Sequence, residues 1–473
     1  MTSTAQKIAY NTVISIIARI ASMILALIII ALATRYLGEA LFGEYIIILA
    51  YLYVFSVLAD LGLYSIVVRE ISKEGADEKR IINNAFTLRF IGGIFIFIVG
   101  IFIALFFPYT FETKLGIAIG AIGFWFLGNS QVLMGVFQKY LRMDKVAIAE
   151  IIGRLAQFAF VVLVIWQDWG FLAIVFALTL GGLVNFLFVF LFVRRYVRLS
   201  FIFDFNFWKK LLKESYPLAL SAILVMIYFK MDTIFLSVMK PTSDVGIYGV
   251  GYKILESLIF FPAMFIGLVM PHLSRWAHLD KEKFKKISQK ALDFLLVLIV
   301  PLIVGTLFLA EKIIVLVAGK NFPESTDVLN ILVFAVGVIF LGALFSNMMI
   351  ARNMQKQLAK IYGLGAAFNF GANLVFIPRY SYIGASLTTV ATEILVTVLM
   401  IFVLYKSLEF FLSFKITLKA IFASAVMGCF LYFLGDYNLF ILLGIAVLSY
   451  FGTLLVIGGI SKEDIEMLVG RKI

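Results

Sequence analysis

Long runs of hydrophobic residues recur along the whole chain, and short polar segments separate them. Each run holds roughly 20 residues or more, and an α-helix of that length crosses about 30 Å of hydrocarbon. A helix also satisfies its own backbone hydrogen bonds, which lipid cannot do for it. We therefore predict an all-α membrane protein with about fourteen transmembrane helices. The predicted helices cover residues 8–34, 42–66, 83–107, 114–138, 147–166, 169–193, 213–239, 245–270, 291–310, 327–351, 358–376, 383–404, 416–434 and 438–457.

The composition supports this prediction. Of the 473 residues, 63% are hydrophobic and only 14% are charged, which is more apolar surface than a soluble core can absorb. The first run is too long for a cleavable signal peptide and leads straight into the second run, so we expect it to remain as a signal-anchor. A single cysteine, Cys429, excludes an intrachain disulfide, and two histidines, His272 and His278, leave little for a metal site.

The net charge of +12 could indicate nucleic-acid binding, but the positions of the charges argue against it. With a cytoplasmic N-terminus, about 30 of the 40 lysines and arginines fall in cytoplasmic loops and tails, as the positive-inside rule requires. Residues 194–213 and 275–290 are the most basic, and there we expect topology signals and contacts with anionic lipid headgroups. We predict a multi-pass protein of the cell membrane, with both termini in the cytoplasm and no nucleic-acid partner.

A weak internal repeat organises the chain. Gly43 and Tyr45 open the second predicted helix after a short turn, and Gly246 and Tyr248 open the eighth in the same way. Each repeat contains an even number of membrane crossings, six, so both copies start on the same side of the membrane. Parallel repeats of this kind leave a cavity between two lobes, which is a common plan of transporters.

The repeat divides the chain into three predicted parts. An amphipathic segment, Leu199–Leu212, mixes aromatic side chains with lysines, and we expect it to lie along the cytoplasmic interface at the start of the second lobe. The parts are an N-terminal lobe of six helices at residues 1–198, a C-terminal lobe of six helices at 199–410, and two further helices with a cytoplasmic tail at 411–473.

Cations away from the ends of the predicted helices are the main candidate functional residues. Arg19 lies near the middle of the first helix, Lys230 in the outer half of the seventh and Lys253 in the outer half of the eighth. Each costs roughly 3 kcal/mol on insertion scales, so the three together cost about 9 kcal/mol. They must face water, a partner or a substrate, and we predict that they bind an anionic substrate in a cavity.

Acidic residues at similar depths allow a second interpretation, in which cations are neutralised within the protein. Lys253 and Glu256 are three residues apart, and Glu150 and Arg154 are four apart, so each pair can share a helical face. The acidic side chains could instead take up a coupling ion, although Asp60 lies near a helix end, where a capping role fits equally well. The residues that we assign to ion coupling or charge pairing are Asp60, Asp232, Glu256, Glu150, Arg154 and Glu393.

The sequence contains no catalytic constellation. It lacks the Gly-Lys-Ser/Thr loop that binds nucleotide phosphates. A Ser/His/Asp arrangement has no support either, because both histidines fall in one predicted cytoplasmic loop. We therefore expect a protein that is not an enzyme and that uses no cofactor and no metal.

Several segments resemble the oligosaccharide flippase or polysaccharide transporter family, within the superfamily that also contains multidrug and toxin extruders and lipid II flippases. Residues 35–73, RYLGEALFGEYIIILAYLYVFSVLADLGLYSIVVREISK, are similar to the family pattern of LG, FG-x-Y, DLGL and RE elements. Residues 216–239 and 245–275 form the second similar region, and residues 369–393, NFGANLVFIPRYSYIGASLTTVATE, form the third. In this order the resemblance covers essentially the whole chain.

The resemblance implies two six-helix lobes around a central cavity, and two extra helices that in lipid II flippases help to form a groove for the lipid tail. It also implies a substrate in which an oligosaccharide is linked to a polyprenyl pyrophosphate. Arg19, Lys230 and Lys253 fit the cavity cations that are thought to hold the pyrophosphate in such flippases. Lys253 and Asp232 match family-typical positions better than Arg154 does. The resemblance does not identify the sugar.

We therefore expect a flippase that moves a lipid-linked oligosaccharide or polysaccharide repeat unit from the cytoplasmic to the outer leaflet by alternating access. Membrane lipids, glycosyltransferases and a polysaccharide polymerase are the expected partners. One alternative is a cation-coupled exporter of small molecules on the same fold, which lone mid-membrane cations disfavour. Another is a membrane-embedded polymerase or ligase, which usually needs a long external loop. A scaffold without transport activity would tolerate the loss of every cavity charge.

Overall fold

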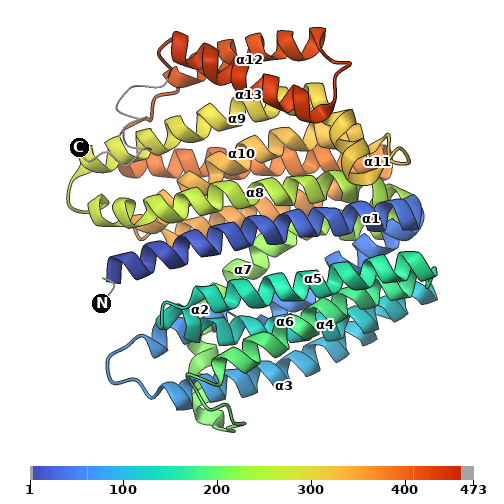
Figure 1. Cartoon of the computed structure of the whole chain (residues 1–473). Coiled ribbons are helices and arrows are strands. Elements are labelled where there is room, and N and C mark those ends of the chain that lie inside the picture. Colours follow the sequence, from blue (N-terminus) through green and yellow to red (C-terminus); the bar gives the residue numbers. More distant parts are fainter. Residues whose placement is uncertain (1–3, 61, 409, 460–473) are drawn as a thin grey trace. The chain divides into compact units, whose positions relative to one another are not determined.

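The computed structural model describes residues 4–60, 62–408 and 410–459, and its regular structure in these ranges is entirely α-helical (Figure 1). Eleven of the described helices are long and apolar enough to cross a membrane, and the chain is a multi-pass membrane protein. The helices are α1 (Thr4–Asp60), α2 (Leu63–Ile71), α3 (Glu78–Ala104), α4 (Phe111–Lys139), α5 (Met143–Gln167), α6 (Phe171–Val193), α7 (Phe205–Met239), α8 (Thr242–Trp276), α9 (Lys281–Ala318), α10 (Ser325–Ala351), α11 (Gln355–Leu408), α12 (Lys415–Phe433) and α13 (Leu439–Val456).

Two of these helices are long enough for two crossings each, because they bend in the middle. Helix α1 has 57 residues and bends at Gly38, and α11 has 54 residues and bends at Ser381. The φ angles there are 70° and 47°, which suit glycine but are uncommon for serine. Both bends fall between predicted helices. Across the described ranges, the eleven candidate spans, the second halves of α1 and α11, and α7 account for the fourteen predicted crossings.

By its internal contacts the chain divides into two compact units. Unit 1 contains Met1–Gly246 and Val317–Asn321, and unit 2 contains Ile247–Leu316 and Phe322–Ile473. The short segment from the end of α9 belongs to unit 1 because it contacts α1: Arg35 Nη1 donates to the Val317 carbonyl at 3.3 Å. The lobe boundaries proposed from the repeat stay a prediction, and the predicted C-terminal tail at residues 460–473 lies outside the described residues.

The short helix α2 lies in the middle of the core of unit 1. Its buried side chains, Leu63, Ile66, Val67 and Ile71, pack with apolar residues of α3, α4, α5 and α6 and with Leu211 from α7. Because α2 has only nine residues, it is held mainly by this packing and not by its own backbone bonds.

Small residues allow α4 to approach α1 closely. A Cβ atom added at Gly116 would lie 2.4 Å from Ile48 Cδ1, and one added at Gly120 would lie 2.6 Å from Leu52 Cδ1. Glycines separated by one helical turn commonly make such helix contacts in membranes. These two glycines therefore serve packing, as their spacing indicates.

The two glycines of the internal repeat, Gly43 and Gly246, meet each other in unit 1. A Cβ atom at Gly43 would lie 1.7 Å from the Thr242 carbonyl oxygen and 3.0 Å from the Gly246 nitrogen. A Cβ atom at Gly246 would lie 2.2 Å from the Glu39 carbonyl oxygen. The obstructing atoms belong to the backbone and cannot move aside as a side chain would, so this contact has room only for glycine at both positions.

The segment that connects α6 to α7 is held along one polar face of α3. Asn83, Asn84 and Thr87 are fully buried there and bond to the backbone of residues 198–204. The bonds are Asn83 Nδ2 to Arg198 O (3.2 Å), Ser200 N to Asn83 Oδ1 (3.0 Å), Ile202 N to Thr87 Oγ1 (3.0 Å) and Asp204 N to Asn84 Oδ1 (3.2 Å). Every second N–H of the segment faces α3, which is the spacing of an extended strand.

This arrangement refines the predicted interfacial segment Leu199–Leu212. Only the part from Phe205 onward is helical, and residues 199–204 have no regular secondary structure. Asp204 begins the helix as its N-cap, and its carboxylate also forms an ion pair with Arg80 at 2.7 Å. The hydrogen bond from the Arg80 guanidinium holds the pKa of the Asp204 carboxyl below its ordinary value.

We expect replacement of Asn84 by alanine to lower the free energy of unfolding by about 2 kcal/mol or more. Asn84 Oδ1 accepts hydrogen bonds from the Asp204 N–H and from Trp208 Nε1, and the substitution removes the acceptor of both. Thermal unfolding in detergent, followed by tryptophan fluorescence, measures the change. The exposed Asn206 supplies a control, since Asn206→Ala should leave the midpoint unchanged. Equal midpoints for both variants would contradict the proposed role of the α3 face.

In unit 2, the hairpin of α12 and α13 packs on α9. Its core includes Met427, Leu442 and Leu454 together with Leu309 of α9. The Tyr450 hydroxyl donates to the Val297 carbonyl at 2.7 Å, which fixes the register of α13 on α9. The last two helices are therefore bound to the rest of unit 2 by both apolar and polar contacts.

Candidate functional site

The first candidate site lies between α1 and α5 in unit 1 and contains Arg19. Arg19 Nη1 is 3.7 Å from Glu150 Oε1, which accepts a 2.8 Å hydrogen bond from Ser22. Arg154 donates to Gln157 at 3.1 Å. Glu150 thus interacts across to α1, whereas its sequence spacing suggested Arg154 as the partner.

The charge balance of this α1–α5 cluster is positive. Arg19 and Arg154 carry two positive charges and Glu150 carries one negative charge, which leaves a formal excess of one positive charge. The ion pair between Arg19 and Glu150 is longer than a hydrogen bond, and the Arg19 side chain is 55% exposed. The cluster can therefore still attract an anion.

Lys230, the second predicted cation, is buried on α7 with 7% of its surface exposed. Its Nζ atom lies 5.3 Å from the ring centroid of Tyr53 on α1, within the range of a cation–π interaction. The Tyr53 ring is about half exposed, so an exposed aromatic face lies beside a buried cation. Asp232 is also buried, and its spacing of two residues directs it to a different face of α7.

Sequence reasoning missed a buried arginine, Arg89, on α3. Arg89 is 2% exposed, and among the described residues its Nη1 and Nη2 atoms have no hydrogen-bond partner. Nε donates to the Gly128 carbonyl at 3.4 Å, and a Cβ atom at position 128 would lie 2.4 Å from Nη2. Asp60 interacts electrostatically with Arg89, and among the described residues its Oδ1 atom has no hydrogen-bond partner either. Arg89 lies six residues inside a predicted helix, so the criterion that selected Arg19 would have found it.

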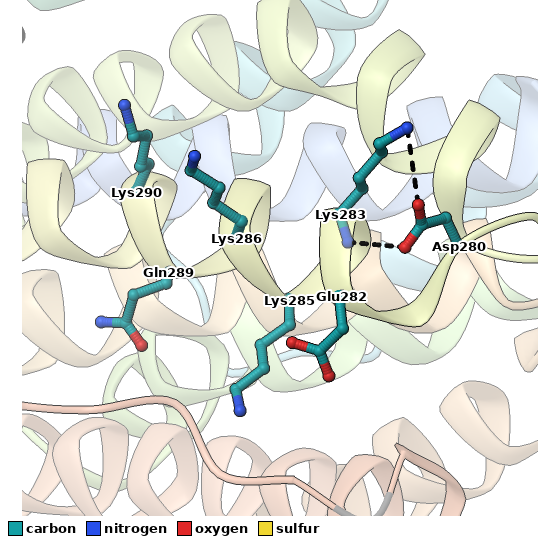
Figure 2. Close-up of a pocket in the computed structure, with 7 residues that line it drawn as sticks. All are labelled: Asp280, Glu282, Lys283, Lys285, Lys286, Gln289 and Lys290. Atoms are coloured by element: carbon teal, nitrogen blue, oxygen red, sulfur yellow. Dashed lines mark hydrogen bonds and ion pairs between the residues drawn. The ribbon is translucent and has the colours of Figure 1, made fainter.

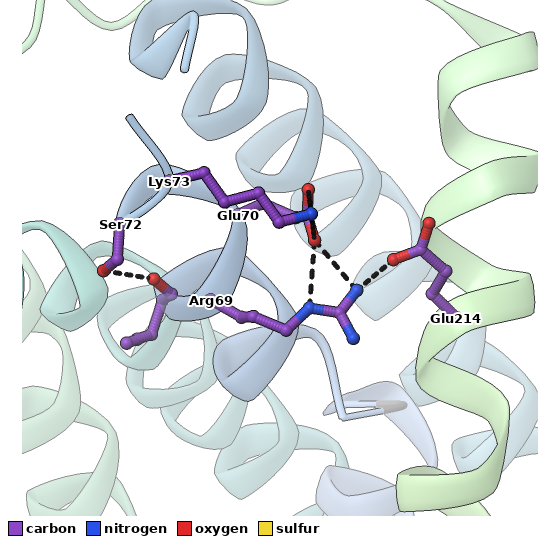
Figure 3. A network of polar contacts seen from close by, with 6 residues as sticks. Arg69, Glu70, Ser72, Lys73 and Glu214 are labelled. Atoms are coloured by element: carbon purple, nitrogen blue, oxygen red, sulfur yellow. Dashed lines mark hydrogen bonds and ion pairs between the residues drawn. The ribbon is translucent and has the colours of Figure 1, made fainter. Parts of the chain in front are cut away.

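A surface ion network joins α2 to α7 in unit 1 (Figure 3). Arg69 contacts Glu70 on its own helix and Glu214 on α7, and Lys73 bonds to the same Glu70 at 2.6 Å. Ser72 donates to the Val68 carbonyl at 2.7 Å. Because exposed ion pairs contribute little individually, the network mainly fixes the orientation of α2 against α7.

In unit 2, Lys253 forms the predicted pair with Glu256. Lys253 Nζ lies 2.7 Å from Glu256 Oε2, on the same face of α8. Both side chains are mostly buried. The third predicted cation therefore has a carboxylate partner on its own helix.

Glu393 lies in a second buried polar region of unit 2, largely formed by α11. Asn373 Nδ2 donates to Asn369 Oδ1 at 3.0 Å, and Asn369 Nδ2 donates to Thr392 Oγ1 at 3.3 Å. Tyr362 interacts electrostatically with Glu393. The sequence criterion of ionisable side chains inside helices does not select asparagines, so it could not indicate this region. A cluster of buried oxygen atoms of this kind suits a small cation or a proton more than an anion.

These observations place the sequence-predicted residues in several separate groups. Unit 1 contains four of these groups, which are Arg19 with Glu150, Arg154, Lys230 with Tyr53, and Asp60 with Arg89. Unit 2 contains the pair of Lys253 with Glu256 and, separately, Glu393. Within the described parts of the chain, no group of three or more His, Cys, Asp or Glu residues could hold a metal ion. The role of each residue in binding a substrate stays a prediction.

Comparison with known proteins gives a consistent result. A family model described as "Polysaccharide biosynthesis protein" matches residues 8–277. The "Probable low-salt glycan biosynthesis flippase Agl15" of Haloferax volcanii is 22% identical over 379 residues, which are 77% of this chain and 76% of that protein. The structure of the lipid II flippase MurJ in an inward closed conformation has a TM-score of 0.76 at 17% identity and covers 94% of this chain and 98% of that chain. An inward-facing multidrug resistance MATE transporter has a TM-score of 0.65 at 14% identity and covers 84% of this chain and 99% of that chain.

Proposed function

Because the chain belongs to the polysaccharide biosynthesis protein family, we propose that it is a flippase for lipid-linked oligosaccharides. Its substrate is an oligosaccharide or polysaccharide repeat unit on a polyprenyl pyrophosphate, which moves from the cytoplasmic to the outer leaflet. The family match over residues 8–277 is the observation that carries this proposal. The similarity to a glycan biosynthesis flippase over about three quarters of each chain and the shared fold with a lipid II flippase support it.

The cations of unit 1 provide the electrostatic part of the mechanism. The α1–α5 cluster has a formal excess of one positive charge, and Lys230 lies beside the exposed ring of Tyr53. A pyrophosphate interacts favourably with such cations at low dielectric constant, and sugar rings pack on exposed aromatic faces. Lys253 interacts with Glu256 and binds the substrate only when that pair opens.

The transport step is alternating access, in which the binding groups face first one side of the membrane and then the other. The lipid tail stays in the bilayer while the polar part crosses. With an inside-negative potential, outward movement of an anion is favourable by about 2.3 kcal/mol per charge per 100 mV. A coupling ion is the second candidate driving force, and the carboxylates Asp60, Asp232 and Glu256 are the groups that would bind it.

The membrane orientation and the partners form the second part of the proposal. Both termini lie in the cytoplasm of a cell whose membrane holds the protein, because that orientation places most basic residues inside. Glycosyltransferases and a polysaccharide polymerase supply the substrate and use the product. The protein itself acts as a transporter and not as an enzyme.

A cation-coupled small-molecule exporter is the rival function on the same fold. The structural similarity to a MATE transporter is lower, with a TM-score of 0.65 against 0.76 for the lipid II flippase. An exporter of organic cations also needs a cavity of net negative charge, whereas the α1–α5 cluster is positive. Ethidium efflux from vesicles separates the two functions.

The test is a flipping assay in reconstituted vesicles that carry a fluorescent lipid-linked oligosaccharide. We expect Arg19→Ala to lower the initial rate about tenfold, which corresponds to about 1.4 kcal/mol. Arg19→Lys should retain most of the activity because the positive charge remains. An imposed inside-negative potential should raise the wild-type rate. Flipping that responds neither to Arg19→Ala nor to the potential would exclude the electrostatic mechanism, and absence of flipping by the wild type would exclude the function.

A further inference from the structure

The first three turns of α9 in unit 2 carry a lysine-rich surface that the proposed transport mechanism does not use. An open depression there is lined by Asp280, Glu282, Lys283, Lys285, Lys286, Gln289 and Lys290. Figure 2 shows these side chains around a single helix, with Lys286 and Lys290 on the same side. The four lysines and two acidic residues give the depression a formal charge of +2.

The acidic residues neutralise only one end of this surface. Asp280 accepts a hydrogen bond from the Lys283 N–H at 3.0 Å and lies 3.5 Å from its Nζ atom. Lys283 Nζ also lies 4.3 Å from the ring centroid of Trp276. Lys283 is therefore held in place, and its positive charge is balanced by Asp280 within the protein.

Lys286 and Lys290 differ from Lys283 in this respect. Both are exposed, and within the described ranges neither has a carboxylate oxygen within 4.0 Å. They are four residues apart, so their amines lie one above the other on α9. Two neighbouring ammonium groups without a counter-ion repel each other in the free protein, and a bound anion removes that repulsion.

The other side of the same helical turns is attached to the segment that leads into α12. Gln289 forms two hydrogen bonds with the backbone of Ser413, each at 2.7 Å. Lys285 Nζ lies 5.4 Å from the ring of Phe410. These contacts hold the segment in place next to α9, and its Phe411 side chain is 64% exposed.

This combination indicates the membrane interface. The candidate membrane span continues from Lys290 into the apolar part of α9, so the lysines lie at its polar end. Exposed aromatic rings gather at the level of lipid headgroups, and lysines there extend toward the phosphates. A soluble anion would use the lysines but would gain nothing from an exposed phenylalanine.

We propose that Lys286 and Lys290 bind the headgroup phosphate of an anionic membrane lipid, at a site separate from the transported substrate. The acyl chains of this lipid lie along the apolar part of α9 beyond Lys290. The site attaches the polar end of α9 to the headgroup layer.

The experiment measures retention of phosphatidylglycerol by the purified full chain, by native mass spectrometry across a lipid titration. For Lys286→Gln with Lys290→Gln, we expect a loss of affinity of roughly tenfold or more, since each lysine near a charged surface contributes about fivefold. Lys286→Arg with Lys290→Arg keeps both charges and should bind as the wild type does. Thermal unfolding checks that the variants are folded, and if the glutamine variant does not fold, the single variant Lys286→Gln replaces it.

The matched control removes two exposed lysines that are also four residues apart, at the start of α11 and outside the two most basic segments, as Lys356→Gln with Lys360→Gln. The same loss of affinity in this control would overturn the proposal in favour of a general effect of net charge. Displacement of the lipid by millimolar inorganic phosphate would also overturn it, because the site would then bind a soluble anion. Unchanged binding in the Lys286/Lys290 glutamine variant would exclude the site. If the lipid site is excluded in this way, flipping by the wild type in vesicles without anionic lipid shows that the proposed flippase function still holds.

Discussion

Replacement of Lys230 by methionine is expected to lower the flipping rate by tenfold to a hundredfold while the protein remains folded. Methionine fills a similar volume and keeps the contact with Tyr53, but it removes the positive charge. A hydrogen bond to a charged group contributes about 1.5–3 kcal/mol, and that range gives the expected loss of rate. The loss should be larger than for Arg19 because Lys230 is buried, where electrostatic interactions are less screened than at the exposed Arg19.

Two variants make this prediction specific to the charge at position 230. Lys230→Arg should retain at least a third of the activity, and Lys209→Met, at the exposed beginning of the same helix, should retain all of it. Rates come from the vesicle assay, normalised to the amount of folded protein. A wild-type rate for Lys230→Met would remove Lys230 from the substrate site. Equal losses for Lys230→Met and Lys209→Met would show that net charge alone matters.

Replacement of Gly43 by alanine should prevent folding. The added methyl group would lie 1.7 Å from the Thr242 carbonyl oxygen, and both helices would have to separate to relieve the overlap. Overpacking of a well-packed interior typically costs 1–3 kcal/mol and more when backbone must move, which is a large part of the stability of a protein. Gly246→Ala should have a similar effect, since its methyl group would lie 2.2 Å from the Glu39 carbonyl oxygen.

Size-exclusion chromatography of detergent extracts measures this effect as the loss of the monodisperse peak. Gly92→Ala on α3 is the matched control, because nothing lies within 4 Å of a Cβ atom there. That variant should be as stable as the wild type or slightly more stable, since alanine favours helix. A monodisperse, thermally stable Gly43→Ala protein would contradict the close contact between the two repeat glycines.

The sequence predicted the membrane architecture because hydrophobic run length is a local property. Eleven of the described helices are candidate membrane spans, α1 and α11 are each long enough for two of the predicted crossings, and the predicted seventh crossing falls in α7. The bends at Gly38 and Ser381 replace the short loops expected there. The structure also gives the repeat glycines a physical role, since Gly43 and Gly246 pack against each other.

The candidate sites were less predictable, because partners come from distant parts of the chain. Spacing along one helix correctly suggested Lys253 with Glu256. The same argument suggested Arg154 for Glu150, whereas Arg19 and Ser22, more than 120 residues away in sequence, are the groups near its carboxylate. Arg89 was missed although its position inside a helix is visible in the sequence. No local pattern indicates that Asn83, Asn84 and Thr87 bind the backbone of the connecting segment.

The composition of unit 1 has a consequence for synthesis of the protein. Domains usually complete their fold in order, starting with the one that leaves the ribosome first. Here the N-terminal unit also includes Val317–Asn321. The Val317 carbonyl accepts a hydrogen bond from Arg35 on α1. The N-terminal unit is therefore complete only after α9 has been translated and inserted, and a chain that stops before residue 317 leaves this unit without its last segment.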